Sequence, residues 1–162
     1  MITRVKIADI GVLKDSGTLV TVGLGSCVGV VFYESKSKMA GMAHIMLAES
    51  SDFKDNADNP MKYADTALPM MLEMMLTKGA QKSNMVAKIA GGSKLFDLEP
   101  ARGNPVTGIG ERNVQAVKKT LKKMNIPLKG EDVGGKCGRT MKMFVDTGQV
   151  EVTSLQGYKK VL

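Results

Sequence analysis

A glycine-rich turn that runs directly into a β-branched segment is the feature that most constrains this chain. Residues Thr21–Glu34 read TVGLGSCVGVVFYE, with Gly23 and Gly25 in the turn and Cys27 just behind them. A turn that binds a phosphate group must open a helix, because the N-terminal amides of that helix hold the phosphate. Adjacent valines and an aromatic pair favour a strand here instead. The sequence therefore argues against a nucleotide-binding turn and directs attention to the thiol.

Short apolar runs separated by turn residues predict a sheet, and two longer segments with helical spacing predict helices. The expected strands are 5–10, 18–22, 28–33, 39–47 and 84–90, followed by a hairpin of 140–145 with 150–153. The expected helices are 61–78, where Pro69 predicts a kink or a late start, and 111–125. This mixture predicts one α+β domain over 1–162, with a substantially antiparallel sheet core and helices packed outside.

The composition of the chain restricts which partners it can bind and in which cellular compartment it can function. No apolar run approaches the roughly 18 residues of a membrane span, and the charged Arg4, Lys6 and Asp9 argue against a signal peptide, so we expect no membrane insertion. Two cysteines without metal-ligand spacing predict free thiols in a reducing cytoplasm. The net charge of +7 suits an acidic partner, but the aromatic content of 4% disfavours nucleic acid. An acidic protein partner and a charge that serves only solubility both remain open.

The chain contains a single histidine, His44, which is therefore the only histidine base available to a Cys27 nucleophile. Such a nucleophile needs a base within about 3 Å to take its proton and then to protonate the leaving group. If 28–33 and 39–47 form a hairpin with a two-residue loop at Ser35-Lys36, Cys27 lies directly opposite His44, with Cβ atoms about 5 Å apart. An imidazolium there is expected to lower the pKa of the thiol by about 1.5 units.

Neighbouring residues offer the other parts of an acyl-transfer site. Gly23, Gly25 and Gly29 leave the backbone free of side chains, so that a substrate carbonyl can approach, and we name Gly25 and Ser26 as candidate oxyanion residues. The hydroxyl of Thr21, on the preceding strand, is expected to orient the second imidazole nitrogen.

The same residues are also compatible with a purely structural role. A cysteine at a strand end is often a small buried hydrophobe, and a histidine on an apolar strand is often a satisfied core residue. Cys137 has no second histidine to activate it, so we predict that it is incidental. Methionines at helical spacing predict core packing. The lysines of the second expected helix predict a solvated face rather than a docking surface for an acidic partner; the four lysines are Lys118, Lys119, Lys122 and Lys123.

Six motifs occur in a fixed order along nearly the whole chain. They follow Thr21 and are GLGSC at 23–27, GMAHIML at 41–47, KYADTAL at 62–68, AKIAGGSKLF at 87–96, IGERNV at 109–114 and GGKCGR at 134–139. Together they resemble the CheD family, the chemoreceptor glutamine deamidases of bacterial and archaeal chemotaxis. The resemblance implies a mixed, largely antiparallel α+β sandwich with helices outside, similar to the catalytic domain of the cytotoxic necrotizing factor toxins.

The resemblance also implies a chemistry and partners. Cys27, His44 and Thr21 would form the catalytic triad: the thiolate attacks a receptor glutamine, ammonia leaves, and water hydrolyses the thioester to glutamate without metal or cofactor. It implies chemoreceptors as substrates, hydrolysis of receptor glutamyl methyl esters as a second reaction, and the CheC phosphatase as a partner in the cytoplasm. Two alternatives remain open, a non-catalytic module that regulates CheC and a thiol redox sensor.

Overall fold

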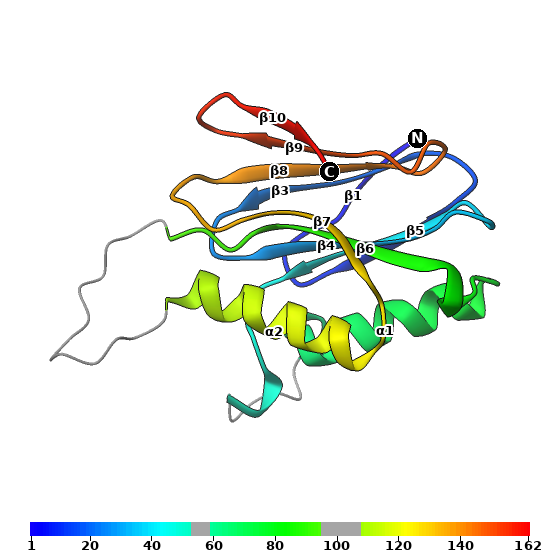
Figure 1. Ribbon diagram of the computed structural model, residues 1–162, viewed down its shortest axis with the longest axis horizontal. Helices are drawn as coiled ribbons and strands as arrows, with labels where there is room; N and C mark the ends of the chain where they lie inside the picture. The colour runs from blue at the N-terminus through cyan, green and yellow to red at the C-terminus, as the bar shows by residue number, and fades with distance from the viewer. Residues whose placement is uncertain (53–58, 95–107) are drawn as a thin grey trace, which may run out of the picture.

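Two five-stranded sheets and a pair of helices stack as three layers (Figure 1). The computed structural model describes residues 1–52, 59–94 and 108–162. The first sheet has the order β1 (Ile2–Arg4), β3 (Thr18–Leu24), β8 (Arg139–Phe144), β9 (Val150–Ser154) and β10 (Lys159–Val161). The second has the order β2 (Ile10–Lys14), β5 (Met39–Ile45), β4 (Val28–Glu34), β6 (Met85–Gly91) and β7 (Leu128–Val133). The helices are α1 (Ala64–Thr77) and α2 (Ile109–Lys123).

Both sheets are mixed but mainly antiparallel. The parallel pairs are β1 with β3 and β6 with β7, and the other pairings are antiparallel. Both helices lie on the face of the second sheet that points away from the first (Figure 1). The predicted α+β class, with a largely antiparallel sheet core and helices outside, is therefore confirmed.

The second sheet is the central layer, and this position explains its sequence. Val31 and Met42 pack between the sheets with Leu19 of the first, while Phe32 packs on the opposite side with the helices. Every residue of β5 is buried, as are all but one of β4. A strand covered on both faces needs a nearly continuous apolar run, which is what these two segments show.

The sequence prediction fails where the chain crosses between the layers. The expected strand at 5–10 is wrong: β1 ends at Arg4 in the first sheet and β2 begins at Ile10 in the second. Between them Ala8 has a φ of 58°, a left-handed conformation that interrupts a strand. Strands β1, β7 and β10 were not expected, because β1 and β10 are short and exposed and β7 carries charged residues and a glycine.

The helices and the C-terminal hairpin agree better with expectation. Helix α1 starts at Ala64 rather than at residue 61, but Pro69 lies inside it, so the proline does not set the start of the helix. Met71 and Met75 are buried in the core, which confirms the packing role of the methionine stripe. The polar loop expected over 50–60 lies partly outside the described residues, at 53–58. In the described part of the chain, neither helix is long and apolar enough to cross a membrane.

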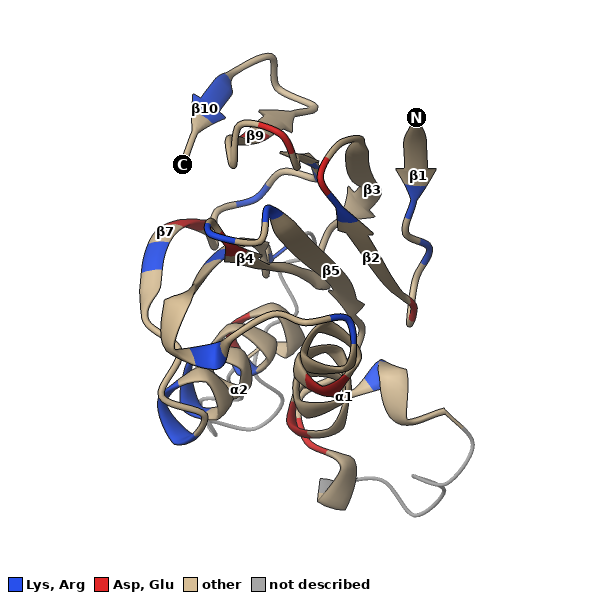
Figure 2. Ribbon diagram, turned by 90° about the vertical axis from the view of Figure 1, so that its right-hand side faces the viewer, with Lys and Arg blue, Asp and Glu red and all other residues tan. Residues whose placement is uncertain are grey.

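The basic residues of α2 are exposed and partly paired. Lys118 forms an ion pair with Glu131 at 2.9 Å and Lys119 forms one with Glu49 at 3.0 Å. Figure 2 shows lysines gathered along this helix and on β10, away from the interface between the sheets. A solvated helix face is therefore the arrangement observed.

Candidate active site

Thr21 and His44 meet across the two sheets. Thr21 lies on β3 and His44 on β5, and Thr21 Oγ1 is 2.7 Å from His44 Nδ1. The Thr21 hydroxyl donates its hydrogen to the Val5 carbonyl at 2.8 Å, so it can only accept from the imidazole. His44 Nδ1 must therefore carry the ring hydrogen, which leaves Nε2 with its lone pair free.

His44 is a neutral base in this environment. Its side chain is 0% exposed, and burial lowers the pKa of the imidazole from 6.5 to about 4. Among the described residues, Nε2 is buried and has no hydrogen-bond partner. A buried imidazole whose Nδ1–H is oriented and whose Nε2 is unoccupied is suited to accepting a proton.

Cys27 lies one residue before β4 but not directly opposite His44. The residue opposite His44 is Gly29, so the predicted pairing of Cys27 with His44 is wrong by two positions. Because side chains alternate from face to face, a shift of two positions preserves the face, whereas a shift of one would have reversed it. The Cys27 thiol is half-buried and makes no hydrogen bond with His44 Nε2.

The register differs because the turn is longer than the two-residue loop expected. Residues 35–38 connect β4 to β5, and Glu34, which is 1% exposed, organises them. The Glu34 carboxylate accepts from the amides of Lys36 at 2.8 Å and Ser37 at 3.3 Å, and from the Ser37 hydroxyl. This side-chain capping fixes a four-residue turn.

The electrostatics of the thiol also differ from expectation. Burial raises the pKa of Cys27 above its ordinary value, the opposite of the lowering expected from a neighbouring imidazolium. The reason is that His44 is itself uncharged near neutral pH. The thiol of Cys27 and the imidazole of His44 are therefore both uncharged near neutral pH.

The loop that carries Cys27 is held by its carbonyl groups. The Gly25 carbonyl accepts from the amide and the hydroxyl of Ser93, both at 2.8 Å, and the Cys27 carbonyl accepts from the Gly92 amide at 2.8 Å. The Ser26 carbonyl accepts from Asn113 Nδ2 at 2.9 Å. With the carbonyls bound, the amides of Ser26 and Cys27 have no acceptor outside the strand ladders within the described residues. The oxyanion role of Gly25 and Ser26 stays a prediction.

Glycines allow the elements around this loop to approach closely. A Cβ on Gly91 would lie 2.3 Å from the Cys27 carbonyl oxygen, and Gly91 has a φ of +111°. A Cβ on Gly29 would lie 2.9 Å from Met141 Sδ and 3.4 Å from Thr21 Cγ2. Gly29 thus leaves space for Thr21 beneath the strand that follows Cys27.

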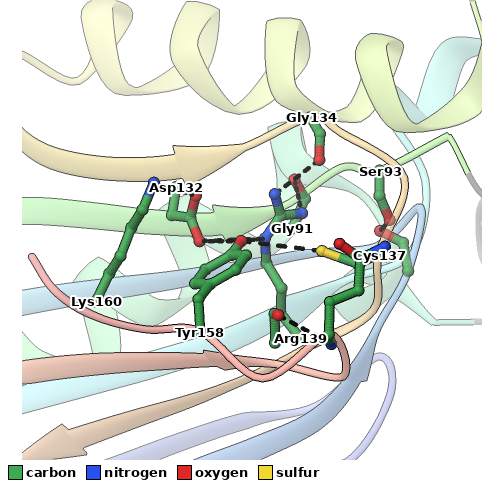
Figure 3. Close-up of polar contacts among 11 residues, drawn as sticks. Gly91, Ser93, Asp132, Gly134, Cys137, Arg139, Tyr158 and Lys160 are labelled. Atoms are coloured by element: carbon green, nitrogen blue, oxygen red, sulfur yellow. Dashed lines mark hydrogen bonds and ion pairs between the residues drawn. The ribbon is translucent and has the colours of Figure 1, made fainter.

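A buried ionic network supports the end of β6 (Figure 3). Arg139 Nε is 3.2 Å from Asp132 Oδ2, and the Tyr158 hydroxyl donates to the same oxygen at 2.8 Å. Arg139 also donates to the carbonyls of Gly91 at 3.3 Å and Gly134 at 2.7 Å. Because Gly91 precedes the Gly92 amide that binds Cys27, the network braces the cysteine loop from behind.

Sequence reasoning missed Ser93, Asn113 and the Arg139 network. Signals existed, since Ser93 follows Gly91-Gly92 and Asn113 falls one residue before the apolar Val114 on the buried face of α2. Cys137 lies beside Tyr158, with Sγ 3.9 Å from the hydroxyl, and its incidental role stays a prediction. Over the described ranges, no three histidine, cysteine or acidic residues form a group that could hold a metal ion.

Together these features define a class: a two-sheet α+β protein in which a buried threonine–histidine pair borders a braced cysteine loop. Comparison with known proteins makes the class specific. The chain belongs to the CheD family, because the model described as CheD chemotactic sensory transduction matches residues 46–154 and close relatives span nearly the whole chain. The resemblance expected from the sequence motifs is confirmed.

The relatives carry informative names. A protein of Clostridium botulinum named "Probable chemoreceptor glutamine deamidase CheD" is 46% identical over 147 residues, covering 91% of this chain and 89% of the relative. A protein of Halalkalibacterium halodurans named "Chemoreceptor glutamine deamidase CheD" is 44% identical over 161 residues, covering 99% and 98%. Among solved structures, the Bacillus licheniformis hypothetical protein YfiH matches with a TM-score of 0.46 and 13% identity, over 74% of this chain and 51% of that one.

Proposed function

We propose that this protein is a chemoreceptor glutamine deamidase, with Cys27 as nucleophile, His44 as base and Thr21 as the residue that orients the base. The observation that carries the proposal is the free lone pair on buried His44 Nε2, next to the loop that bears Cys27. The names of the relatives supply the substrate class, which is the side-chain carboxamide of a receptor glutamine.

The reaction follows from the neutral pair. As Cys27 Sγ attacks the carboxamide carbon, His44 Nε2 takes the thiol proton, and the imidazolium is stabilised because its Nδ1–H already donates to Thr21. The same proton then passes to the departing nitrogen, so the C–N bond breaks and ammonia leaves a thioester. Water, deprotonated by His44, opens the thioester to glutamate and restores the thiol.

The loop around Cys27 supplies the remaining elements. The oxyanion that forms during attack needs amide donors. Of the two candidate residues, Gly25 already donates its amide to the Gly23 carbonyl at 3.0 Å, so we propose the amide of Ser26, together with that of Cys27, for this role. The mechanism uses protein groups and water alone. A glutamyl methyl ester reaches the same thioester, so we include receptor methylesterase activity in the proposal.

The wider biological setting is also proposed. We propose that residues 1–162 form a single deamidase domain that acts on chemoreceptors in the cytoplasm, with the CheC phosphatase as a partner. We further propose a fold related to the cytotoxic necrotizing factor catalytic domain. The alternative function, a non-catalytic regulator of CheC, predicts that a Cys27→Ala variant fully restores chemotaxis in a strain that lacks the protein.

The test incubates the protein with a chemoreceptor cytoplasmic fragment and measures ammonia release, with mass spectrometry to locate each amide converted to acid. We expect Cys27→Ala to abolish release and His44→Gln to lower kcat by about 10²-fold, the usual cost of a lost general base. Thr21→Val, which keeps the volume and loses the hydroxyl, should cost less. Cys137→Ala is the matched thiol control, and full activity in Cys27→Ala would refute the proposal.

A further inference from the structure

Asn113 of α2 connects the nucleophile loop to the strand of the base. Its side chain is 1% exposed, and Nδ2 donates to the Ser26 carbonyl at 2.9 Å and to the Met46 carbonyl at 3.0 Å. Ser26 immediately precedes Cys27, and Met46 lies two residues beyond His44. One carboxamide therefore bridges the two segments that carry the reacting groups.

The orientation of this side chain is fixed by its partners. Both carbonyls can only accept hydrogen bonds, so the amide nitrogen must face them and both of its hydrogens are used. Asn113 Oδ1 is consequently left buried, without a partner among the described residues. Leaving a buried acceptor unsatisfied is unfavourable for folding, but an apolar side chain would instead take this donor from the carbonyls of Ser26 and Met46. The side chain thus satisfies two carbonyls while its own oxygen stays unpartnered, and it ties together the two segments that carry them.

The helix that carries Asn113 also packs against Gly92 and Ser93, two residues that hydrogen-bond to the cysteine loop. A Cβ on Gly110 would lie 2.5 Å from the Ser93 carbonyl oxygen and 2.6 Å from that of Gly92, so the first turn of α2 contacts these residues directly. Ser93 and Gly92 are the donors to the Gly25 and Cys27 carbonyls. Asn113 is thus presented from a rigid base.

We propose that Asn113 is a positioning residue that sets the separation between Cys27 Sγ and His44 Nε2 during catalysis. It touches neither reacting atom and acts through the Ser26 and Met46 carbonyls. The proposal rests on the proposed deamidase function where it is tested by kcat. A second test, the rate of Cys27 alkylation, depends only on the chemistry of the thiol.

The test variant is Asn113→Leu, which keeps the number and branching of the side-chain heavy atoms and removes both donors. The matched control is Thr120→Val, two turns further along α2. It also removes a buried polar group, but among the described residues this hydroxyl bonds only to Ala116 of its own helix. With a receptor fragment we expect Asn113→Leu to lower kcat by about 10²-fold and to leave KM within about threefold, because a small misplacement of reacting groups is costly. Thr120→Val should change kcat by less than about twofold, and comparable melting temperatures in both variants would separate positioning from folding.

The second readout is the alkylation rate of Cys27 by iodoacetamide, mapped by peptide mass spectrometry to distinguish it from Cys137. His44→Gln should slow alkylation in the otherwise wild-type protein. In the Asn113→Leu background the rate should already be low, and adding His44→Gln should change it little. This readout needs no substrate, so it tests the positioning role even if ammonia release from receptors is never seen.

Three results would overturn the proposal: kcat unchanged in Asn113→Leu, an equal loss in Thr120→Val, or additive effects of the Asn113 and His44 substitutions on alkylation. If Asn113→Leu does not fold, Asn113→Ser takes its place. Serine keeps one donor, so an intermediate loss of kcat and of His44-dependent alkylation is expected, and wild-type values for both would contradict the proposal.

Discussion

At the scale of single residues, the site depends on charge states that burial imposes. His44 is held neutral because its ring is enclosed between the sheets, and the Thr21 hydroxyl selects which nitrogen carries the hydrogen. Cys27 is held as a thiol for the same reason, since burial disfavours its charged form. The proton must therefore move during attack on the substrate, rather than before substrate arrives. This protects the cysteine from unselective reaction, because the thiolate is the reactive species.

The buried histidine predicts a pH dependence of stability. The pKa of His44 is lowered from 6.5 to about 4, so between these values the unfolded chain binds a proton that the folded chain does not. The free energy of unfolding should rise with pH across this window. The His44 contribution is complete above pH 6.5 and is lost as the pH falls toward 4, which amounts to about 2 kcal/mol between pH 7 and pH 5.

Urea unfolding at a series of pH values measures this effect. His44 is the only histidine, so His44→Gln should remove most of the slope between pH 5 and pH 7. Below that range carboxylates contribute as well, including Glu34, whose pKa is lowered by its hydrogen bonds in the turn despite the opposing effect of burial. An unchanged slope in the His44→Gln variant would contradict a buried neutral imidazole.

At the scale of elements, β4 needs a residue without a side chain where it packs against Thr21. Gly29 lies opposite His44, and a Cβ there would be 2.9 Å from Met141 Sδ and 3.0 Å from Leu24 Cδ1. We expect Gly29→Ala to destabilise the protein by about 1–3 kcal/mol through overpacking. It should also lower kcat, because Thr21 Cγ2 is the next atom in contact.

Calorimetry and ammonia release together check the Gly29 prediction. Met141→Ala in the Gly29→Ala background removes the closest neighbour, so part of the lost activity should return even though Met141→Ala alone creates a cavity. Strictly additive losses in the double variant would show that the glycine is not needed for space.

The elements also show what sequence can and cannot predict here. Strands β4 and β5 are predictable because both are apolar on both faces. The observed register differs from the predicted one by two residues, so residues 27 and 44 still lie on the same face of the sheet. The register itself depended on Glu34, whose carboxylate organises a longer turn, and no local rule required that role. Asn113 and Arg139 act through contacts distant in sequence, so only the assembled fold identifies them.

At the scale of the whole molecule, the proposed chemistry lies at the junction of the two sheets. The first sheet supplies Thr21 and Arg139, and the second supplies His44, Asp132 and Gly91. Among the described residues, the polar links across this largely apolar interface include the threonine–histidine contact, the Arg139 network (Figure 3) and the hydrogen bond from the Tyr33 hydroxyl to the Val145 carbonyl at 3.0 Å. Relative movement of the sheets would displace the base from its partner and loosen the support of the cysteine loop.

Replacing Arg139 alone and replacing Arg139 together with Asp132 should have different effects on stability and on activity. Arg139 and Asp132 are 4% and 6% exposed, so Arg139→Met should leave a buried carboxylate with only Tyr158 and the partly exposed Lys160, at a cost of about 3 kcal/mol. Adding Asp132→Leu removes that carboxylate and should recover much of the stability in urea unfolding. Activity should not recover in parallel, because the Gly91 carbonyl has still lost its donor behind the cysteine loop. If the double variant is no more stable than the single one, the carboxylate is not the source of the cost. If its kcat returns with its stability, Arg139 serves the fold and not the site.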